Sequence, residues 1–539
     1  MTRLRSAVLT TAVVSGLLAG SVPALAGPAP LNTTRIPARY AGQALPWHPC
    51  ADAELPSPRL PGTEDLECAT FRTPRDWERL DEHQDLTIAI SRLKSTGATT
   101  ASVLTNPGGP GGAGRDLPAV LRGQAKLREH QEIIGIDQRG TGKSTTASCG
   151  GVYGTGAELD ARNRDPRNLN LIVDSVKYVA DSCQRASGEL GPLVDTFQMT
   201  KDLDLLRVLL GREKVNWVGY SAGTWLGAHY AQRFPDRTGR FVLDSATEFT
   251  STWQSSFAWQ PMGFERRWRQ DFLPWMARYD VKYHFGTSGE AARQTFENVR
   301  YALSRKPVDL DGVRVGPAQL DNLALGALKS KHSFPATADN LVRIKALTEA
   351  ATPEHVNADA RAAVKAAVSK PVLPLGIADR AADPLDSLLA TLTNTVCNDG
   401  PWTGNRQSII RQSQQQINRG QTLITGTWMA FQFCAFWRNQ PRPLPVLDGK
   451  GAAPVLIVQS ENDPATPIEG ARKAHTAFRD SRLLTVTGEG DHGIYGMGNK
   501  AVDKIVNDYL VDGVVPADRS VPGMPLPVPA GLPSGAGAR

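Results

Sequence analysis

A serine lies at the centre of a tight turn between an apolar strand and a helix. Residues 219–223 are Gly-Tyr-Ser-Ala-Gly; they follow the apolar run 215–218, and a helical pattern continues to about Phe234. In such a turn the strand and the helix nearly touch, so small residues are needed at the outer positions, and the serine hydroxyl is lifted out of the sheet. The pentapeptide alone also fits an ordinary helix start with a serine near its N-cap. Other parts of the sequence are therefore needed to distinguish a catalytic nucleophile from a helix N-cap.

Short apolar segments alternate with helical patterns on both sides of this turn. Strands are predicted near residues 67–72, 86–93, 102–105, 132–136, 215–218, 240–244, 454–459 and 483–487, with helices over 199–210 and after the serine. This alternation predicts a mostly parallel sheet covered by helices on both faces. The first two strands are joined by a short charged stretch, which allows them to be antiparallel at one edge.

The alternation stops for about 200 residues between Asp244 and Pro454. A compact domain does not hold a structureless connection of that length. Helical patterns near residues 260–280, 290–303, 340–350, 359–368 and 405–418 predict an inserted helical cap. Seven of the eleven tryptophans fall in this stretch, and we expect most of them in the core of the cap and two or three in a cleft between cap and sheet.

The two ends of the chain differ in composition from the middle. Residues 1–26 combine Arg3 and Arg5 with a short apolar stretch and end in Ala24-Leu25-Ala26, as a secretory signal does. We expect a signal peptide over 1–26, a pro-segment or flexible arm over 27–46, the first part of the sheet domain over 47–245, the cap over 246–445, the C-terminal part of the sheet domain over 446–513 and a flexible tail over 514–539. The apolar stretch is too short to cross a bilayer, so we expect a secreted protein without a membrane anchor.

The net charge and the cysteine content indicate which ligands and which disulfides to expect. The formal net charge of +6 is a mild bias for 539 residues, and no basic run interleaved with aromatic residues indicates nucleic acid binding. The six cysteines all follow the signal segment, and an even number in an exported chain favours disulfides. We expect the sequential pairs, because each closes a local loop: Cys50–Cys68, Cys149–Cys183 and Cys397–Cys434. Neither C-x-x-C nor H-E-x-x-H is present, so no metal site and no cofactor is predicted.

A serine nucleophile needs a base and a carboxylate that orients the base. The strand at 454–459 is followed by Ser-Glu-Asn-Asp-Pro, and the strand at 483–487 by Gly-Glu-Gly-Asp-His. Ligands of open α/β sheets bind at the carboxyl ends of strands, where all three loops lie. We therefore expect Ser221 as the nucleophile, His492 as general base and then acid, and Asp463 as the orienting carboxylate. Glu461 and Asp491 remain alternatives for the carboxylate.

The strand at 102–105 ends in the loop Asn-Pro-Gly-Gly-Pro-Gly-Gly, residues 106–112. A tetrahedral intermediate needs two backbone N–H donors, and we expect them from Ala222 and from Gly109 in this loop. A dinucleotide site is the alternative, because Gly109, Gly111 and Gly114 match G-x-G-x-x-G, although Pro110 interrupts that fingerprint. A P-loop at 140–144 is excluded because residue 137, where the first glycine is required, is an aspartate.

Taken together, these motifs resemble the proline-iminopeptidase-like serine peptidases, and more narrowly the secreted tripeptidyl aminopeptidases of actinomycetes. The likeness runs from about Trp47 to about residue 512 and includes Cys397-Asn-Asp and Cys434-Ala-Phe-Trp in the cap. It implies an α/β-hydrolase fold, with a mostly parallel central sheet and a large helical cap inserted between late strands. The chain departs from many proline iminopeptidases at Asn106-Pro107, where those enzymes have a histidine; this leaves the second oxyanion donor open.

The resemblance implies release of tripeptides, sometimes tetrapeptides, from free N-termini, in some members with a preference for proline. It also implies acidic residues in the cap that pair with the α-ammonium group of the substrate, for which Glu248 and Asp399 are the candidates. We expect a monomeric, secreted exopeptidase that acts on peptides through an acyl-enzyme. An esterase or lipase with the same triad is the alternative, and a catalytically silent binding protein on this fold is the third.

Overall fold

The structure is a computed structural model that describes residues 36–55, 59–80, 84–153, 159–369, 376–377 and 384–532. The expected signal peptide lies outside these residues, and the expected arm is described from Ile36 onward. That part of the arm forms a short helix, α1 (Ala38–Ala41), whose Tyr40 is buried and donates a hydrogen bond to Asp85 Oδ1 at 2.7 Å. The described part of the arm is therefore packed against the sheet domain.

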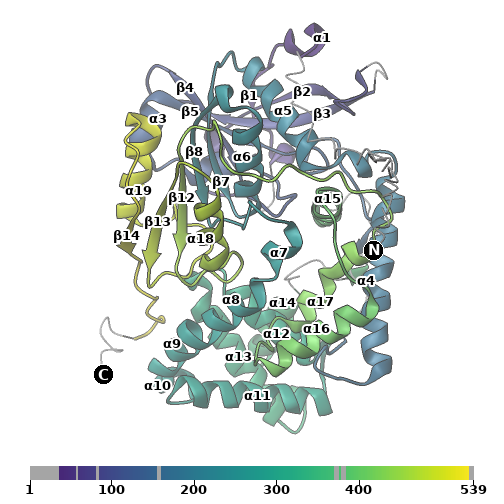
Figure 1. Ribbon diagram of the computed structural model, residues 1–539. Helices are drawn as coiled ribbons and strands as arrows, with labels where there is room; N and C mark the ends of the chain where they lie inside the picture. Colours follow the sequence, from purple (N-terminus) through teal and green to yellow (C-terminus); the bar gives the residue numbers. More distant parts are fainter. Residues whose placement is uncertain are drawn as a thin grey trace, which may run out of the picture. The chain divides into compact units, whose positions relative to one another are not determined.

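Ten strands form the central sheet, in the order β1-β2-β3-β5-β4-β7-β8-β12-β13-β14 (Figure 1). Their bounds are β1 (His48–Pro49), β2 (Glu67–Pro74), β3 (Asp85–Leu93), β4 (Ala101–Asn106), β5 (Gln131–Ile136), β7 (Val215–Tyr220), β8 (Thr238–Asp244), β12 (Val455–Ser460), β13 (Ser481–Thr487) and β14 (Arg519–Pro522). The pairs from β5 to β14 are parallel, whereas β1, β2 and β3 join antiparallel at one edge. The predicted mostly parallel sheet is confirmed.

Helices cover both faces of this sheet, because alternate side chains of each strand point to opposite sides. Trp217 and Val218, neighbours on β7, lie in two different hydrophobic cores. The core on the side of Trp217 is closed by α5 (Thr196–Leu209), α6 (Ala222–Arg233) and α18 (Ile468–Ala477), and the core on the other side by α2 (Leu117–Val120), α3 (Ala125–His130) and α19 (Lys500–Asn507).

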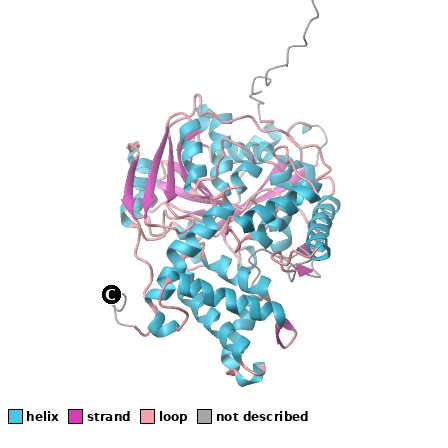
Figure 2. Cartoon of the chain, turned by 60° about the horizontal axis from the view of Figure 1, so that its bottom comes forward, coloured by secondary structure: helices cyan, strands magenta, loops and turns pink. Residues whose placement is uncertain are grey.

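The cap lies between β8 and β12 and is mainly helical (Figure 2). Its helices are α7 (Trp253–Phe257), α8 (Gln260–Arg267), α9 (Leu273–Arg278), α10 (Asp280–Tyr283), α11 (Gly289–Arg305), α12 (Pro317–Ala327), α13 (Phe334–Glu349), α14 (Ala358–Val368), α15 (Pro384–Asn398), α16 (Arg406–Asn418) and α17 (Thr425–Ala430). Trp268, Trp275 and Phe334 are buried in a core of the cap itself. The helix α15 differs from its neighbours, since Leu389, Leu392 and other buried side chains belong to the core beneath α5 and α6.

Three disulfides join the cysteines in sequential pairs, Cys50–Cys68, Cys149–Cys183 and Cys397–Cys434. The second pair anchors the long helix α4 (Pro166–Ser187), and the third ties α15 to the turn η9 (Gln432–Phe436). The described residues contain no free cysteine.

The C-terminal segment, expected to be a flexible tail from residue 514, is held at two places instead. Its residues 519–522 form the edge strand β14, which pairs in parallel with β13. Further along, the carbonyl oxygen of Pro527 accepts a hydrogen bond of 2.7 Å from the indole of Trp275 in the cap. A proline-rich composition obscured a strand of only four residues. No helix in the described ranges is both long enough and apolar enough to cross a bilayer.

Candidate active site

Ser221 lies at the sharp turn between β7 and α6, with φ 55° and ψ −124°. A positive φ is unfavourable for a residue with a Cβ, so this turn is held by its surroundings. A Cβ at position 219 would lie 2.5 Å from the carbonyl oxygen of Gly223, and one at position 223 would lie 2.8 Å from that of Asn106. Both glycines are therefore required by close backbone contacts, as the sequence pattern predicts.

The glycine loop after β4 lies directly beside this turn. A Cβ at Gly108 would lie 2.5 Å from Tyr220 O and 2.8 Å from Ser221 Cβ. The backbone amides of Gly109 and Ala222 donate to no acceptor among the described residues, and both residues line the cavity that contains Ser221. Two free N–H groups beside a serine hydroxyl are the arrangement that an oxyanion hole requires.

His492 and Asp463 are paired on neighbouring loops. Nδ1 of His492 lies 2.9 Å from Oδ2 and 3.0 Å from Oδ1 of Asp463. Asp463 is fully buried and also accepts hydrogen bonds of 2.9 Å from the amides of Ala465 and Thr466. Burial raises the pKa of Asp463, but the charge of His492 and these hydrogen bonds outweigh it and hold the pKa below its ordinary value. The carboxylate therefore stays ionised next to the imidazole.

The loop that carries His492 is fastened to the end of β8. The amides of Ile494 and Tyr495 donate to Asp244 at 3.0 and 2.7 Å, and the amide of Gly493 donates to Ser245 Oγ at 2.7 Å. Burial raises the pKa of Asp244 to about 6. The sequence analysis placed Asp244 at the end of a strand but gave it no role. Its position at the same sheet edge as the triad loops could have indicated that it supports one of them.

Ser221 and His492 line one cavity of about 340 Å³ between the sheet and the cap. Ser221 Oγ and the His492 ring are not hydrogen-bonded to each other in the described structure, and such contacts often tighten only when substrate binds. The wall of the cavity is largely apolar. Its apolar side chains are those of Trp253, Phe257, Phe264, Leu325, Leu385, Leu388, Leu389, Leu392, Ile424 and Phe431. Of the seven cap tryptophans only Trp253 lines it, fewer than the two or three expected from the sequence.

Neither candidate for binding the substrate amine lines this cavity. Asp399 is 3% exposed and accepts hydrogen bonds from the amide and hydroxyl of Thr196 and from the Trp253 indole. Glu248 is 7% exposed and accepts a hydrogen bond of 2.6 Å from the Trp259 indole. Both carboxylates are hydrogen-bonded to protein donors, and the structure does not place either of them on the wall of the Ser221 cavity.

The two other carboxylates considered for the triad are also engaged elsewhere. Glu461 accepts a hydrogen bond of 2.8 Å from the amide of Gly488. Asp491 forms an ion pair of 2.8 Å with Arg267 and accepts a hydrogen bond of 2.7 Å from the amide of Lys331. Asp463 is the one of the three whose carboxylate contacts the His492 ring.

The glycines of the dinucleotide-like pattern serve packing. A Cβ at Gly111 would lie 2.8 Å from the side chain of Thr391 on α15, and one at Gly114 would lie 2.5 Å from the carbonyl oxygen of Ile136. Protein atoms thus occupy the space that a pyrophosphate would need. The alternative of a dinucleotide site is not supported.

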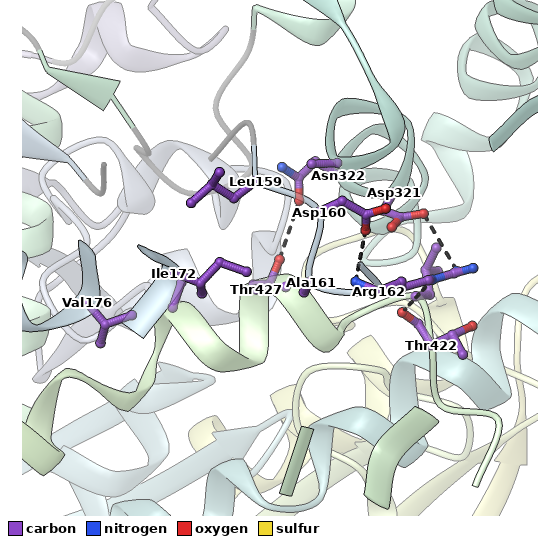
Figure 3. Close-up of a pocket in the computed structure, with 14 residues that line it drawn as sticks. Leu159, Asp160, Ala161, Arg162, Ile172, Val176, Asp321, Asn322, Thr422 and Thr427 are labelled. Atoms are coloured by element: carbon purple, nitrogen blue, oxygen red, sulfur yellow. Dashed lines mark hydrogen bonds and ion pairs between the residues drawn. The ribbon is translucent and has the colours of Figure 1, made fainter. Parts of the chain in front are cut away.

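A second, smaller pocket of about 50 Å³ shares Thr427 with the cavity that contains Ser221 and is drawn in Figure 3. The charged residues that line this smaller pocket are paired with one another or with Arg300 beside it: Arg300 Nε lies 3.0 Å from Asp321 and its guanidinium also pairs with Asp160, while Arg162 pairs with Asp321 at 3.7 Å. Burial raises the pKa of Asp321 to about 6, against the effect of the two arginines. This cluster is an ionic tie between the segment before α4 and the cap.

Comparisons with known proteins place the chain in a family. It is 32% identical over 500 residues to the tripeptidyl aminopeptidase of Streptomyces lividans, covering 88% of this chain and 86% of that protein. The chain belongs to the tripeptidyl aminopeptidase family. Residues 422–522, which include Asp463 and His492, match the family described as "TAP-like protein". The protein is thus a serine hydrolase of the tripeptidyl aminopeptidase type, with the α/β-hydrolase fold.

The chain is also similar, at lower identity, to proteins with other names. The chain is 25% identical over 527 residues to the serine protease Hip1 of Mycobacterium tuberculosis, covering 94% of this chain and 95% of that protein. It is also 25% identical over 538 residues to a carboxylesterase B of the same species, covering 94% and 97%. Among solved structures, a proline iminopeptidase of Mycobacterium smegmatis matches with 15% identity and a TM-score of 0.37, covering 82% of this chain and 98% of that one.

Proposed function

We propose that the protein is a secreted serine exopeptidase that releases tripeptides from the free N-termini of peptides. The observation that carries this proposal is the contact of 2.9 Å between Nδ1 of His492 and the buried carboxylate of Asp463, with His492 lining the same cavity as the strained Ser221. The tripeptidyl aminopeptidases that cover most of the chain supply the substrate class. Three disulfides support export to an oxidising compartment.

In the proposed reaction, His492 removes the proton from the hydroxyl of Ser221 as that oxygen attacks the scissile carbonyl. The amides of Gly109 and Ala222 donate hydrogen bonds to the carbonyl oxygen and stabilise its negative charge. His492 then gives its proton to the leaving amine, and an acyl-enzyme on Ser221 remains. Water deacylates the enzyme by the same route, and Asp463 stabilises the imidazolium in both halves.

A cavity closed by the cap favours short peptides over folded chains. The described residues that line it contain no carboxylate. The requirement for a free N-terminus is therefore tested directly. Steady-state rates on tripeptide nitroanilides, with the N-terminus free or acetylated, decide it. A rate unchanged by acetylation would contradict the exopeptidase proposal.

An esterase acting on acyl chains is the second candidate, and the apolar wall of the cavity favours it. Leu388, Leu392 and Phe431 would suit an acyl chain as well as apolar peptide side chains. Rates on nitrophenyl esters of increasing chain length, compared with peptide nitroanilides, separate the two candidates. In both cases Ser221→Ala should abolish turnover while the protein stays folded, and a serine-directed phosphonate should label Ser221 with one equivalent; absence of labelling would favour a silent binding protein.

A further inference from the structure

A single lysine faces the cavity of the candidate active site. Lys329 lies between α12 and the turn η7 (Lys331–Ser333) and lines the cavity together with Ser221 and His492. Its carbonyl oxygen accepts a hydrogen bond of 2.9 Å from the amide of His492. The backbone of Lys329 is therefore fastened to the residue that would protonate the leaving group.

The ammonium group of Lys329 has no partner in the described part of the chain. The contrast with Lys331, two residues on, is sharp: Lys331 is buried, forms an ion pair with Glu489 and lies 3.6 Å from Asp491. For Lys329 Nζ, no hydrogen bond or ion pair is formed with any described residue, although solvent reaches the side chain. Lys331 is thus paired within the protein, whereas Lys329 is available to a ligand that enters the cavity.

The surroundings of Lys329 favour an anion. Among the described residues that line the cavity, Lys329 and His492 are the only ionisable ones. Asp463 is the carboxylate whose charge acts on the ammonium, but it is already committed to His492 and to its own loop. Enclosure by the cavity walls lowers the pKa of Lys329, and Asp463 opposes that shift. A lysine ammonium in a largely apolar cavity, with no hydrogen-bonded partner of its own, is stabilised by an incoming carboxylate, which favours its charged form.

We propose that Lys329 is a specificity-determining residue that binds a carboxylate of the peptide substrate on the leaving-group side of the scissile bond. The hydrogen bond from the His492 amide to the Lys329 carbonyl oxygen indicates the leaving-group side, because His492 would deliver its proton to the leaving amine. The carboxylate has two sources in a peptide: the C-terminal carboxylate of a leaving group of one residue, or an acidic side chain within that leaving group. The inference rests on the proposed peptidase activity and adds to it a preference for substrates with an anionic leaving segment.

Four peptides that share one N-terminal tripeptide test this inference. Two end in alanine, as the free acid or the amide, and two end in an amidated residue, glutamate or glutamine. Wild type should cleave at least one anionic member of a pair faster, and the pair that shows the difference identifies the source of the carboxylate. Lys329→Met should lower kcat/KM for that anionic peptide about 10- to 100-fold, the range for a lost charge-assisted hydrogen bond. The uncharged partner peptide should change little, and Lys329→Arg should retain the preference.

The outcomes that overturn the inference are distinct from those that overturn the peptidase function. If wild type cleaves the free-acid and amide peptides at equal rates, and also the glutamate and glutamine peptides at equal rates, the proposed role of Lys329 is overturned. No variant is needed for that result. An equal loss on charged and uncharged peptides in Lys329→Met would show that the lysine acts through His492 instead. If no peptide is cleaved while nitrophenyl acetate is hydrolysed in a Ser221-dependent manner, the peptidase function fails and this inference fails with it.

Discussion

The carboxylate of Asp463 binds the imidazole of His492 at Nδ1. Nδ1 of the imidazole lies 2.9 and 3.0 Å from the two carboxylate oxygens, and Thr466 Oγ1 donates to Oδ2 of the same carboxylate at 3.0 Å. With Nδ1 bound to a carboxylate, the proton of a neutral imidazole is kept there and Nε2 is left as the base.

Replacing Asp463 by asparagine should therefore remove most of the activity and little of the stability. An amide in this position favours the wrong imidazole tautomer and no longer stabilises the imidazolium, and the corresponding change in a serine protease costs about 10⁴-fold in kcat. We expect a loss of that order for Asp463→Asn, measured as kcat on a peptide nitroanilide. Glu461→Gln is the matched control, because Glu461 lies on the same loop and its side chain bonds only Gly488 among the described residues. An equal loss in both variants would contradict the assignment.

Gly108 should tolerate no side chain, because the glycine loop passes so close to Ser221. It has φ +94°, and a Cβ there would lie 2.5 Å from Tyr220 O and 2.9 Å from the amide nitrogen of Ala222. Gly108→Ala should displace the loop from the nucleophile and lower kcat by about 100-fold or more, the cost of one oxyanion donor. Strain at a positive φ should lower the free energy of unfolding by about 1–2 kcal/mol.

Gly123→Ala is the control for that variant. Nothing lies within 4 Å of a Cβ at Gly123, and its φ is not in the left-handed region. Both activity and melting temperature should stay near wild type. Full activity in Gly108→Ala would show that the loop does not supply the second oxyanion donor.

Sequence reasoning located the sheet and the loops of the triad because both depend on local signals. A buried strand followed by glycine, aspartate or histidine is visible in the chain itself, and β7, β12 and β13 each begin or end within two residues of their predicted bounds. The pairing of Asp463 with His492 followed from the carboxyl ends of parallel strands meeting at one sheet edge.

The elements that sequence reasoning missed are those whose environment is set by distant parts of the chain. The helix α15 is the clearest case: from Leu389 to Asn398 every residue is buried, so no polar face marks its period. Its side chains nevertheless line the cavity. The partners of Asp399 could not be predicted for the same reason, since Thr196 lies about 200 positions from Asp399.

The disulfide Cys397–Cys434 should stabilise both the fold and the cavity wall. It closes a loop of 37 residues and ties the end of α15 to η9. Replacing both cysteines by serine should lower the free energy of unfolding by about 3–4 kcal/mol, the cost expected from loop entropy for a loop of this length. Because Leu385 and Leu392 of α15 line the cavity, KM should also rise. Urea unfolding of the double variant measures the first effect, and an unchanged midpoint would show that α15 is held without the bond.

Asp399 should make the protein less stable as the pH rises. Burial, reinforced by the charge of Asp195, raises the pKa of Asp399 to about 7 in the folded state. The folded chain thus holds this proton more tightly than the unfolded chain, whose carboxyl has its ordinary pKa of 3.8. Stability contributed by the protonated form is complete below that value and is lost progressively as the pH rises toward 7. The expected loss from this group is on the order of 4 kcal/mol.

Asp399→Asn isolates this contribution from those of other buried carboxylates. Asparagine keeps one acceptor oxygen for Thr196 or Trp253 and cannot ionise. Urea midpoints at pH 4.5 and pH 8 should therefore differ less in the variant than in wild type. Since Asp399 does not line the cavity, the variant should keep its preference for a free over an acetylated N-terminus. A parallel decline in both proteins would show that Asp399 is ionised already at low pH, and a lost preference would return it to the role of amine-binding residue.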